Sequence, residues 1–166
     1  MAKLPICKYG APVLRRRCPE VKEITGDIRK ILEDMRQTMY EEDGVGLAAS
    51  QVGEAKRLIV LDGGGGLWQL INPRIISRRD EGASLEGCLS LPGVTVKINR
   101  SQEVTVEALN KKGEKIIVEG KGLLSYILQH EIDHLNGILI IDYLDKKKKK
   151  KTEEKLKKWI KETPKM

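Results

Sequence analysis

Residues 121–137, KGLLSYILQHEIDHLNG, contain both histidines of the chain and constrain its fold more than any other segment. The segment is predicted to be a helix. In a helix, His130 and His134 lie one above the other on one face, so both imidazoles can point at one metal ion. Glu131 lies beside them, close enough to reach a water on that ion without being a ligand. This HExxH arrangement is typical of zinc hydrolases, and two ordinary helix histidines are the alternative interpretation.

A metal site on this helix needs a third ligand, and the sequence offers two candidates. Glu154, with Glu153 beside it, has the spacing of the third ligand in thermolysin-like proteases, but both follow six consecutive lysines. The chain has no third histidine. Cys88 lies between a glycine and a polar loop, in LEGCLSLPG at 85–93. A lone cysteine is more often a small buried apolar residue. Beside an HExxH pair that lacks a third ligand, Cys88 is nevertheless the better candidate.

The remaining sequence mixes helix and strand patterns. Residues 25–44 form a predicted helix with apolar residues at helical spacing, and Thr25 or Asp27 can cap its start. The predicted strands are 57–62, then 67–73 resuming at 74–77 after Pro73, then the hairpin 103–120, and 138–141. A last helix with a weak apolar stripe follows the lysine run. Strands, an isolated helix, and then a strand and a helix predict an α+β fold rather than alternating βαβ units.

Composition limits the cellular context and the number of domains. A chain of 166 residues is expected to form one domain. No apolar run approaches the roughly 20 residues of a membrane span, and the N-terminus lacks a signal-peptide pattern. The three cysteines are odd in number and widely spaced, which indicates reduced thiols. We therefore expect a cytoplasmic protein without a membrane partner.

The charge of the chain is distributed unevenly. Residues 146–166 hold 11 Lys and 3 Glu, whereas residues 1–145 hold 20 Lys and Arg against 21 Asp and Glu. A lysine run is usually a solvated helix end, but it can also neutralise the phosphates of a nucleic acid. A non-enzymatic RNA-binding protein with a vestigial metal site is therefore a second functional class that these residues leave open.

Three segments of the chain resemble, in order and spacing, the signature motifs of the peptide deformylases: GVGLAASQ at 44–51, EGCLS at 86–90 and HEIDH at 130–134. The N-terminal PICKYGAPVLRRRCPEV also resembles the opening segment of that family. Small departures are Ser50, where the family often has proline, and Thr95, where bacterial members often carry a basic side chain.

The resemblance extends from about residue 5 to about residue 145 and implies how the chain is organised. Residues 1–145 are expected to form a single deformylase-like metallohydrolase domain, and residues 146–166 a basic C-terminal helix or tail. The implied fold has antiparallel sheets packed around the central helix that carries HExxH, with a helix at the C-terminus.

The resemblance also implies an activity and a set of catalytic groups. The reaction is hydrolysis of the N-formyl group from the initiator methionine of new polypeptides, which releases formate. The implied ligands of one divalent metal ion are Cys88, His130 and His134. The resemblance favours Fe²⁺ as the physiological ion, with Zn²⁺, Ni²⁺ or Co²⁺ expected in purified protein, whereas the ligand types alone do not select among these metals. Glu131 moves the proton, while the Gln51 side-chain amide and the Leu89 backbone N–H stabilise the oxyanion.

Further residues are implied to bind substrate or to support the metal ligands. Val45 and Gly46 are expected to pair through their backbone with the extended peptide, with Gly87 on the same site. The methionine side chain requires a flexible apolar pocket, and Val45, Leu123 and Ile127 are its expected lining. The residues implied to support the metal ligands are Glu86, Arg100 and Asp133. A buried Glu86–Arg100 pair would fix the cysteine loop, whereas two solvated surface charges are the alternative.

The expected partners are formylated nascent peptides and the ribosome. A deformylase must find its substrate as the peptide leaves the ribosome, whose surface is largely ribosomal RNA. In the family, the C-terminal helix is linked to ribosome contact. The basic segment 146–166 is therefore expected to dock on that surface.

Overall fold

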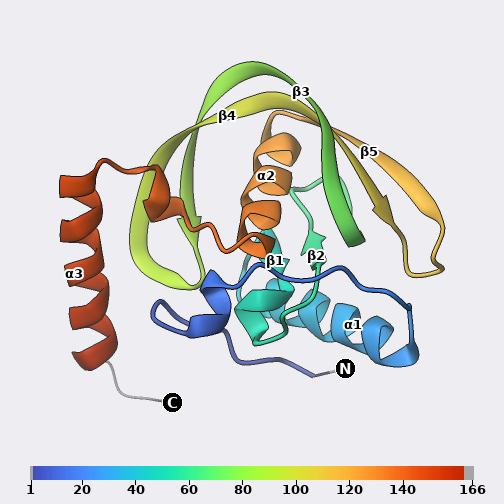
Figure 1. The fold of residues 1–166 in the computed structure, drawn as a ribbon, viewed down its shortest axis with the longest axis horizontal. Coiled ribbons are helices and arrows are strands. Elements are labelled where there is room, and N and C mark those ends of the chain that lie inside the picture. Colours follow the sequence, from blue (N-terminus) through green and yellow to red (C-terminus); the bar gives the residue numbers. More distant parts are fainter. Residues whose placement is uncertain (1, 163–166) are drawn as a thin grey trace.

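Two long antiparallel strands, β3 (Trp68–Cys88) and β4 (Leu91–Leu109), organise the fold of this computed structural model, which describes residues 2–162. They bend together into an arch, and the helix α2 (Leu123–Leu135) lies beneath it (Figure 1). The described strands form one five-stranded antiparallel sheet in the order β1-β2-β3-β4-β5. The predicted α+β class, with antiparallel strands around a central helix, is confirmed.

The other elements surround this core. The bounds of the remaining strands and helices are α1 Gly26–Glu41, β1 Gly46–Ala48, β2 Leu58–Leu61, β5 Lys115–Lys121 and α3 Lys146–Glu162. Within residues 2–162, three 3₁₀ turns cover Pro12–Arg15, Ala49–Val52 and Ile140–Tyr143. No described helix is long and apolar enough to cross a membrane.

Several elements form where the local patterns predict them. Thr25 caps α1, because its side chain accepts a hydrogen bond from the Ile28 N–H. The hairpin predicted at 103–120 forms between β4 and β5. Pro73 does not end β3. The pairing register shifts between Ile71 and Arg74, and such an irregularity accommodates a residue that cannot donate to the ladder.

The prediction of a strand at 138–141 is wrong. Its last two residues, Ile140 and Ile141, begin a 3₁₀ turn and are buried in an apolar cluster instead. The Asp142 carboxylate accepts a hydrogen bond from the Leu139 N–H at 3.0 Å and closes the turn. A short apolar run fits a buried turn as well as a buried strand. It forms a strand only where the edge of a sheet lies beside it in the fold, and its sequence does not show this.

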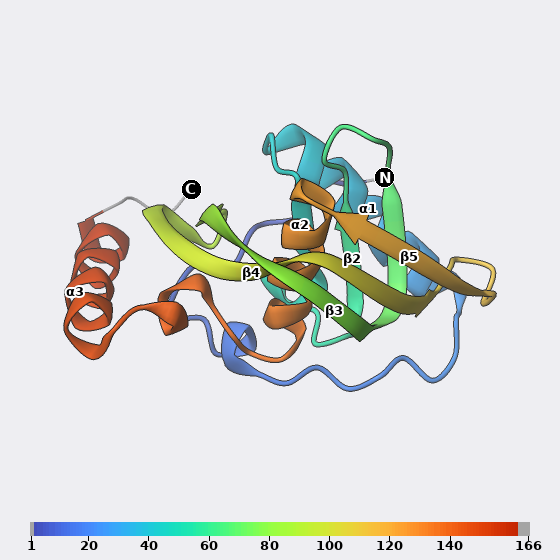
Figure 2. The same cartoon turned by 90° about the horizontal axis from the view of Figure 1, so that it is seen from above.

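Helix α2 is buried on most of its faces, which fixes its position. Leu128, Ile132 and Leu135 pack into one cluster with residues of β2, β3, β4 and β5. The buried Arg57 guanidinium holds its C-terminal end, donating to the Leu135 carbonyl at 3.2 Å and to the Asn136 side chain at 3.1 Å. The helix that carries both histidines is therefore held along its length and at its end. Figure 2 shows it among the strands of the sheet.

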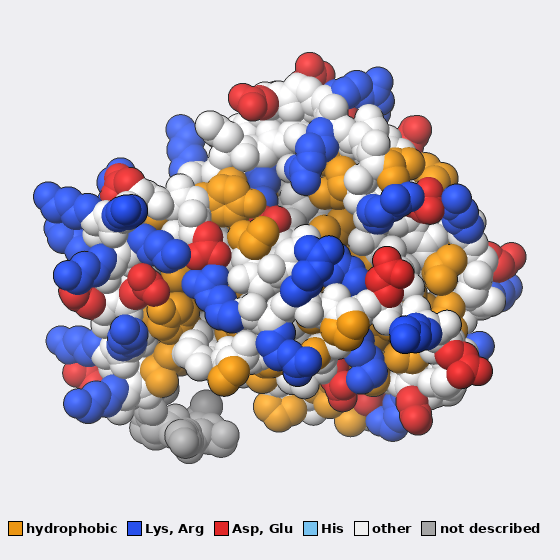
Figure 3. Space-filling view, viewed as in Figure 1, with side chains coloured by type: hydrophobic (Ala, Val, Ile, Leu, Met, Phe, Trp, Pro, Cys, Tyr) orange, Lys and Arg blue, Asp and Glu red, His pale blue; other side chains and the backbone are white. Residues whose placement is uncertain are grey.

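Helix α3 lies at the edge of the molecule and is attached by one face. Leu156 is fully buried against the cluster that includes Ile140 and Ile141. The Tyr9 hydroxyl donates to Glu153, and Lys149 pairs with Asp142 at 2.9 Å. Most lysines of the helix are exposed, and in Figure 3 they form the cluster of basic side chains at the left.

Candidate metal centre

The three predicted ligands converge at one point. Cys88 ends β3, while His130 and His134 lie one turn apart on α2. The Cys88 Sγ lies 3.3 Å from His134 Nε2, which lies 3.2 Å from His130 Nε2. Among the described residues these three form the one group of potential ligands whose donor atoms all lie within 4.8 Å of each other. Glu154, the alternative third ligand, is exposed on α3 and is not part of this group.

The hairpin between β3 and β4 presents the cysteine to the helix. The strand register shifts between Gly87 and Cys88, and Cys88 pairs with Leu91 across a tight turn. This irregularity ends the regular ladder at the thiol. A bulge of this kind turns a side chain out of the alternation of the strand.

A buried ion pair holds the first histidine. The Arg100 guanidinium donates to both Glu86 carboxylate oxygens, from Nε at 2.9 Å and from Nη2 at 2.8 Å. The His130 Nδ1–H donates to Glu86 Oε1 at 2.9 Å, which leaves Nε2 facing the other two donor atoms. Burial raises the pKa of Glu86, but hydrogen bonds from Arg100 and His130 outweigh it and lower that pKa to about 2.

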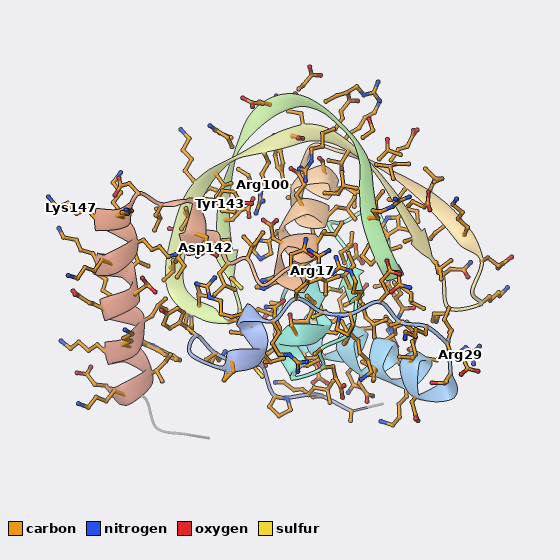
Figure 4. All side chains as sticks on the ribbon, in the orientation of Figure 1. Arg17, Arg29, Arg100, Asp142, Tyr143 and Lys147 are labelled. Carbon is orange, nitrogen blue, oxygen red and sulfur yellow. The ribbon has the colours of Figure 1, made fainter. Side chains whose placement is uncertain are left out.

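The network continues to the predicted supporting residue Asp133 and to Tyr143, and only Tyr143 was not indicated by the sequence. Arg100 Nη1 donates to Asp133 Oδ2 at 2.7 Å and to the Tyr143 hydroxyl at 3.0 Å. That hydroxyl donates to Asp133 Oδ2 at 2.6 Å, and the guanidinium lies 4.8 Å from the Tyr143 ring centroid. Figure 4 shows Arg100 and Tyr143 side by side. The predicted Glu86–Arg100 contact is therefore buried rather than a solvated surface pair.

Glu131 is buried beside the ligands. Its Oε2 lies 3.9 Å from His130 Nε2, and its Oε1 has no hydrogen-bond partner within residues 2–162. Burial raises the pKa of Glu131 to about 7, against the opposing effect of His130. Gly46 lies against this carboxylate, since a Cβ built there would be 2.5 Å from Glu131 Oε2. Only glycine leaves room for the carboxylate in this position.

Gln51 is fixed so that its amide nitrogen faces the cysteine. Its Oε1 accepts from the Ala48 N–H at 3.0 Å, while Nε2 donates to the Ser90 hydroxyl at 3.2 Å and lies 3.6 Å from Cys88 Sγ. Ser90 was not predicted from the sequence.

A cavity of about 370 Å³ opens beside the three donor atoms. Eleven predicted site residues line it: Val45, Gly46, Gln51, Glu86, Gly87, Cys88, Leu89, Leu123, Ile127, His130 and Glu131. His134, Arg100 and Asp133 lie outside its wall. The lining residues that sequence reasoning missed are Asp43, Gly44, Ser84, Leu85 and Tyr126. Tyr126 could have been found, because it lies one turn before His130 on the same helix face.

Comparisons with known proteins point to one family. The family model described as polypeptide deformylase matches residues 3–150. A peptide deformylase of Desulfitobacterium hafniense is 53% identical over 142 residues, covering 86% of this chain and 95% of that protein. One of Thermodesulfovibrio yellowstonii is 46% identical over 162 residues, covering 95% and 98%. The crystal structure of peptide deformylase from Ehrlichia chaffeensis in complex with actinonin matches with a TM-score of 0.92 at 38% identity, covering 99% of this chain and 100% of that one.

The fold and the site are those of a metal-dependent hydrolase. An antiparallel sheet surrounds the HExxH helix, and a thiol converges on its two imidazoles. Within that class, the matched residues and identities show that the chain belongs to the polypeptide deformylase family. It is therefore an enzyme that hydrolyses the N-formyl group of formylmethionine at the start of newly synthesised polypeptides. The predicted family and activity are confirmed, and the non-enzymatic RNA-binding protein is not supported.

Replacing Gly46 with alanine is expected to lower kcat/KM for a formyl-Met tripeptide about 100-fold, because Glu131 is the predicted proton carrier and misplacing such a group by about 1 Å costs that much. The added methyl group would force the Glu131 carboxylate out of its position. The control is Gly26→Ala, where a Cβ meets nothing within 4 Å. Thermal unfolding of both variants checks the fold. A folded Gly46→Ala enzyme with normal turnover would show that the close approach has no catalytic consequence.

Proposed function

We propose that this enzyme hydrolyses the formamide at a single divalent metal ion held by Cys88, His130 and His134. The convergence of their three donor atoms is the observation that carries this proposal. The donor set fits such an ion, since thiolate and imidazole ligands suit Fe²⁺, Zn²⁺, Ni²⁺ and Co²⁺. The hydrogen bond from His130 Nδ1 to Glu86 leaves Nε2 free to ligate. We take Fe²⁺ as the physiological ion on the family resemblance, with the other three able to replace it in purified protein.

The bound metal would supply Lewis-acid chemistry, by polarising the formyl oxygen and lowering the pKa of water. Glu131 would act as the proton carrier. It takes a proton from the attacking water and returns it to the leaving amine nitrogen. Its burial and its unpartnered Oε1 support this role, because within residues 2–162 no donor competes for this carboxylate oxygen.

Gln51 and Leu89 would stabilise the negative charge that develops on the formyl oxygen. The Gln51 amide is held at both ends, so its Nε2 stays directed toward the thiol without reorganisation. Leu89 follows Cys88 directly, and its backbone N–H would be the second donor. Preorganised donors of this kind typically contribute about 100- to 1,000-fold each.

The peptide would bind along β1 with its methionine side chain in the cavity. Gly46 begins the edge strand β1 and Val45 precedes it, so the Gly46 backbone and the Val45 N–H would pair with an extended chain, while the Val45 carbonyl accepts from the Asp62 N–H. Gly87 lies on the cavity wall contributed by β3. Val45, Leu123 and Ile127 would form the apolar pocket, since all three line the same cavity.

The network around Arg100 would orient the ligands rather than react. Glu86 fixes the ring of His130, while Arg100 holds Glu86 and Asp133 in place. Hydrogen-bond partners of metal ligands set the ring orientation and raise metal affinity.

The Glu131→Gln enzyme is expected to retain metal and to lose activity about 100- to 10,000-fold, because general acid–base catalysis contributes that range. Glutamine keeps the shape of the side chain but cannot carry the proton. Metal content and kcat are measured on the same preparation. Turnover close to that of the unchanged enzyme would refute the assigned role.

Cys88→Ser is expected to reduce bound metal well below one ion per chain, because a hydroxyl is a poor substitute for a soft thiolate. The matched control is Glu154→Gln, which removes the alternative ligand and should leave metal content unchanged. Metal analysis after dialysis against a weak chelator provides the readout. If the glutamine variant loses metal and the serine variant keeps it, the ligand set proposed above is wrong.

We further propose that the basic segment 146–166 docks the enzyme on ribosomal RNA in the cytoplasm, apart from the catalytic region 1–145. The way in which α3 is attached to the body supports this proposal. Leu156 and Glu153 attach α3 to the body, so that most lysines on the other faces are exposed. A basic helix held in one orientation presents its charges together, and lysine–phosphate contacts weaken as salt rises.

Changing Lys147, Lys151 and Lys158 together to glutamine should weaken cosedimentation with ribosomes and flatten its salt dependence, because each lost phosphate contact lowers the slope by about one. All three side chains are exposed. The control changes the exposed Lys22, Lys97 and Lys112 to glutamine, which removes the same net charge elsewhere. Hydrolysis of a short formyl-Met peptide should stay the same in both. Equal ribosome binding by the two variants would argue against a docking helix.

A further inference from the structure

The loop that joins β2 to β3 touches the cavity wall from outside. It contains four consecutive exposed glycines, Gly63–Gly66, and it lies beside the first turns of α2 (Figure 2). A Cβ built on Gly63 would lie 3.1 Å from Ile127 Cδ1 and 3.5 Å from Leu123 Cδ2. Both side chains line the cavity, whereas Gly63 is not among the residues that line it. The Gly63 backbone is therefore directly behind this part of the wall.

The start of this loop is firmly anchored. The Asp62 N–H donates to the Val45 carbonyl at 2.8 Å, and the Tyr40 hydroxyl donates to Asp62 Oδ2 at 2.6 Å. Asp62 Oδ1 accepts from the N–H groups of Gly64 and Gly66, at 2.9 and 3.3 Å. Gly63 follows this anchor directly, so its backbone cannot easily withdraw from the wall. The opposite side is also fixed, because α2 is packed along its length.

We propose that Gly63 determines side-chain specificity, because its missing side chain leaves the room that the tips of Ile127 and Leu123 occupy behind the methionine pocket. The inference rests on the proposed function, in which these two residues line the methionine pocket. A methionine side chain is long and unbranched and fits irregular space. With the backbone on both sides held in place, the depth of the pocket depends on how close to Gly63 the two apolar tips can lie.

A methyl group at position 63 would close this space. At 3.1 Å it is closer to Ile127 Cδ1 than ordinary van der Waals contact allows, so the tip of that side chain must shift by a few tenths of an ångström. Because Gly63 lies behind the wall, the shift is directed into the cavity. A long substrate side chain should lose more from this shift than a short one.

Gly63→Ala is expected to lower the ratio of kcat/KM for a formyl-Met tripeptide to that for the formyl-aminobutyrate analogue about 3- to 10-fold, less than the effect of a whole methylene in a pocket. The ethyl group of the analogue ends well short of the methionine thioether. Gly65→Ala is the matched control, because its Cβ meets nothing within 4 Å and neither glycine has a positive φ. Its ratio should equal that of the unchanged enzyme. An unchanged ratio in Gly63→Ala overturns the inference.

Ile127→Val tests the contact itself, because it removes the Cδ1 atom that a Cβ at position 63 would meet. In this background, Gly63→Ala should produce little further change in the substrate ratio. An equally large change there would mean that the effect does not pass through Ile127, and would overturn the inference. Ile127→Val alone should change the ratio. If it does not, the pocket assigned under the proposed function is wrong, whereas a change with Ile127→Val but none with Gly63→Ala rejects only the role of Gly63.

Discussion

The buried contact between Arg100 and Glu86 is the interaction on which the site depends. Taking two charges out of water is costly, and close geometry with further hydrogen bonds must compensate. Here the guanidinium donates to both oxygens of Glu86, to Asp133 and to Tyr143. Removing either partner of such a pair typically costs about 3–5 kcal/mol, because the other charge is left uncompensated.

This contact matters because the three proposed ligands come from distant parts of the chain. His130 and His134 are brought together by helical spacing alone, but Cys88 lies at the end of a long hairpin. Arg100 on β4 holds Glu86 on β3, and it also reaches Asp133 on α2. The pair thus fastens the hairpin to the helix near the thiol and orients the imidazole of His130 at the same time. The position and the orientation of the proposed ligands therefore have a common cause.

Sequence alone could predict what local spacing determines. The HExxH helix, the cap of α1 and the hairpin of β4 and β5 all follow from patterns within about 20 residues. The segment 138–141 was mistaken for a strand because its apolar run does not say which neighbours it will have. The family motifs pointed to Cys88 and Gln51, whose neighbours in the fold are remote in sequence. Tyr143 and Ser90 were missed, since their roles arise only when the chain is folded around Arg100 and Gln51.

Close approaches to glycine backbone explain how one helix can serve a cavity bounded by several strands. Glu131 on α2 lies against Gly46 of β1, and a Cβ at Gly82 of β3 would overlap the Tyr126 hydroxyl. At both positions a side chain of α2 occupies the volume where a strand side chain would otherwise stand. Packed interiors leave few voids, so a buried carboxylate gains room only where a neighbour gives it up. The glycines of the strands are therefore as much a part of the site as the groups on the helix, although they carry no reactive atoms.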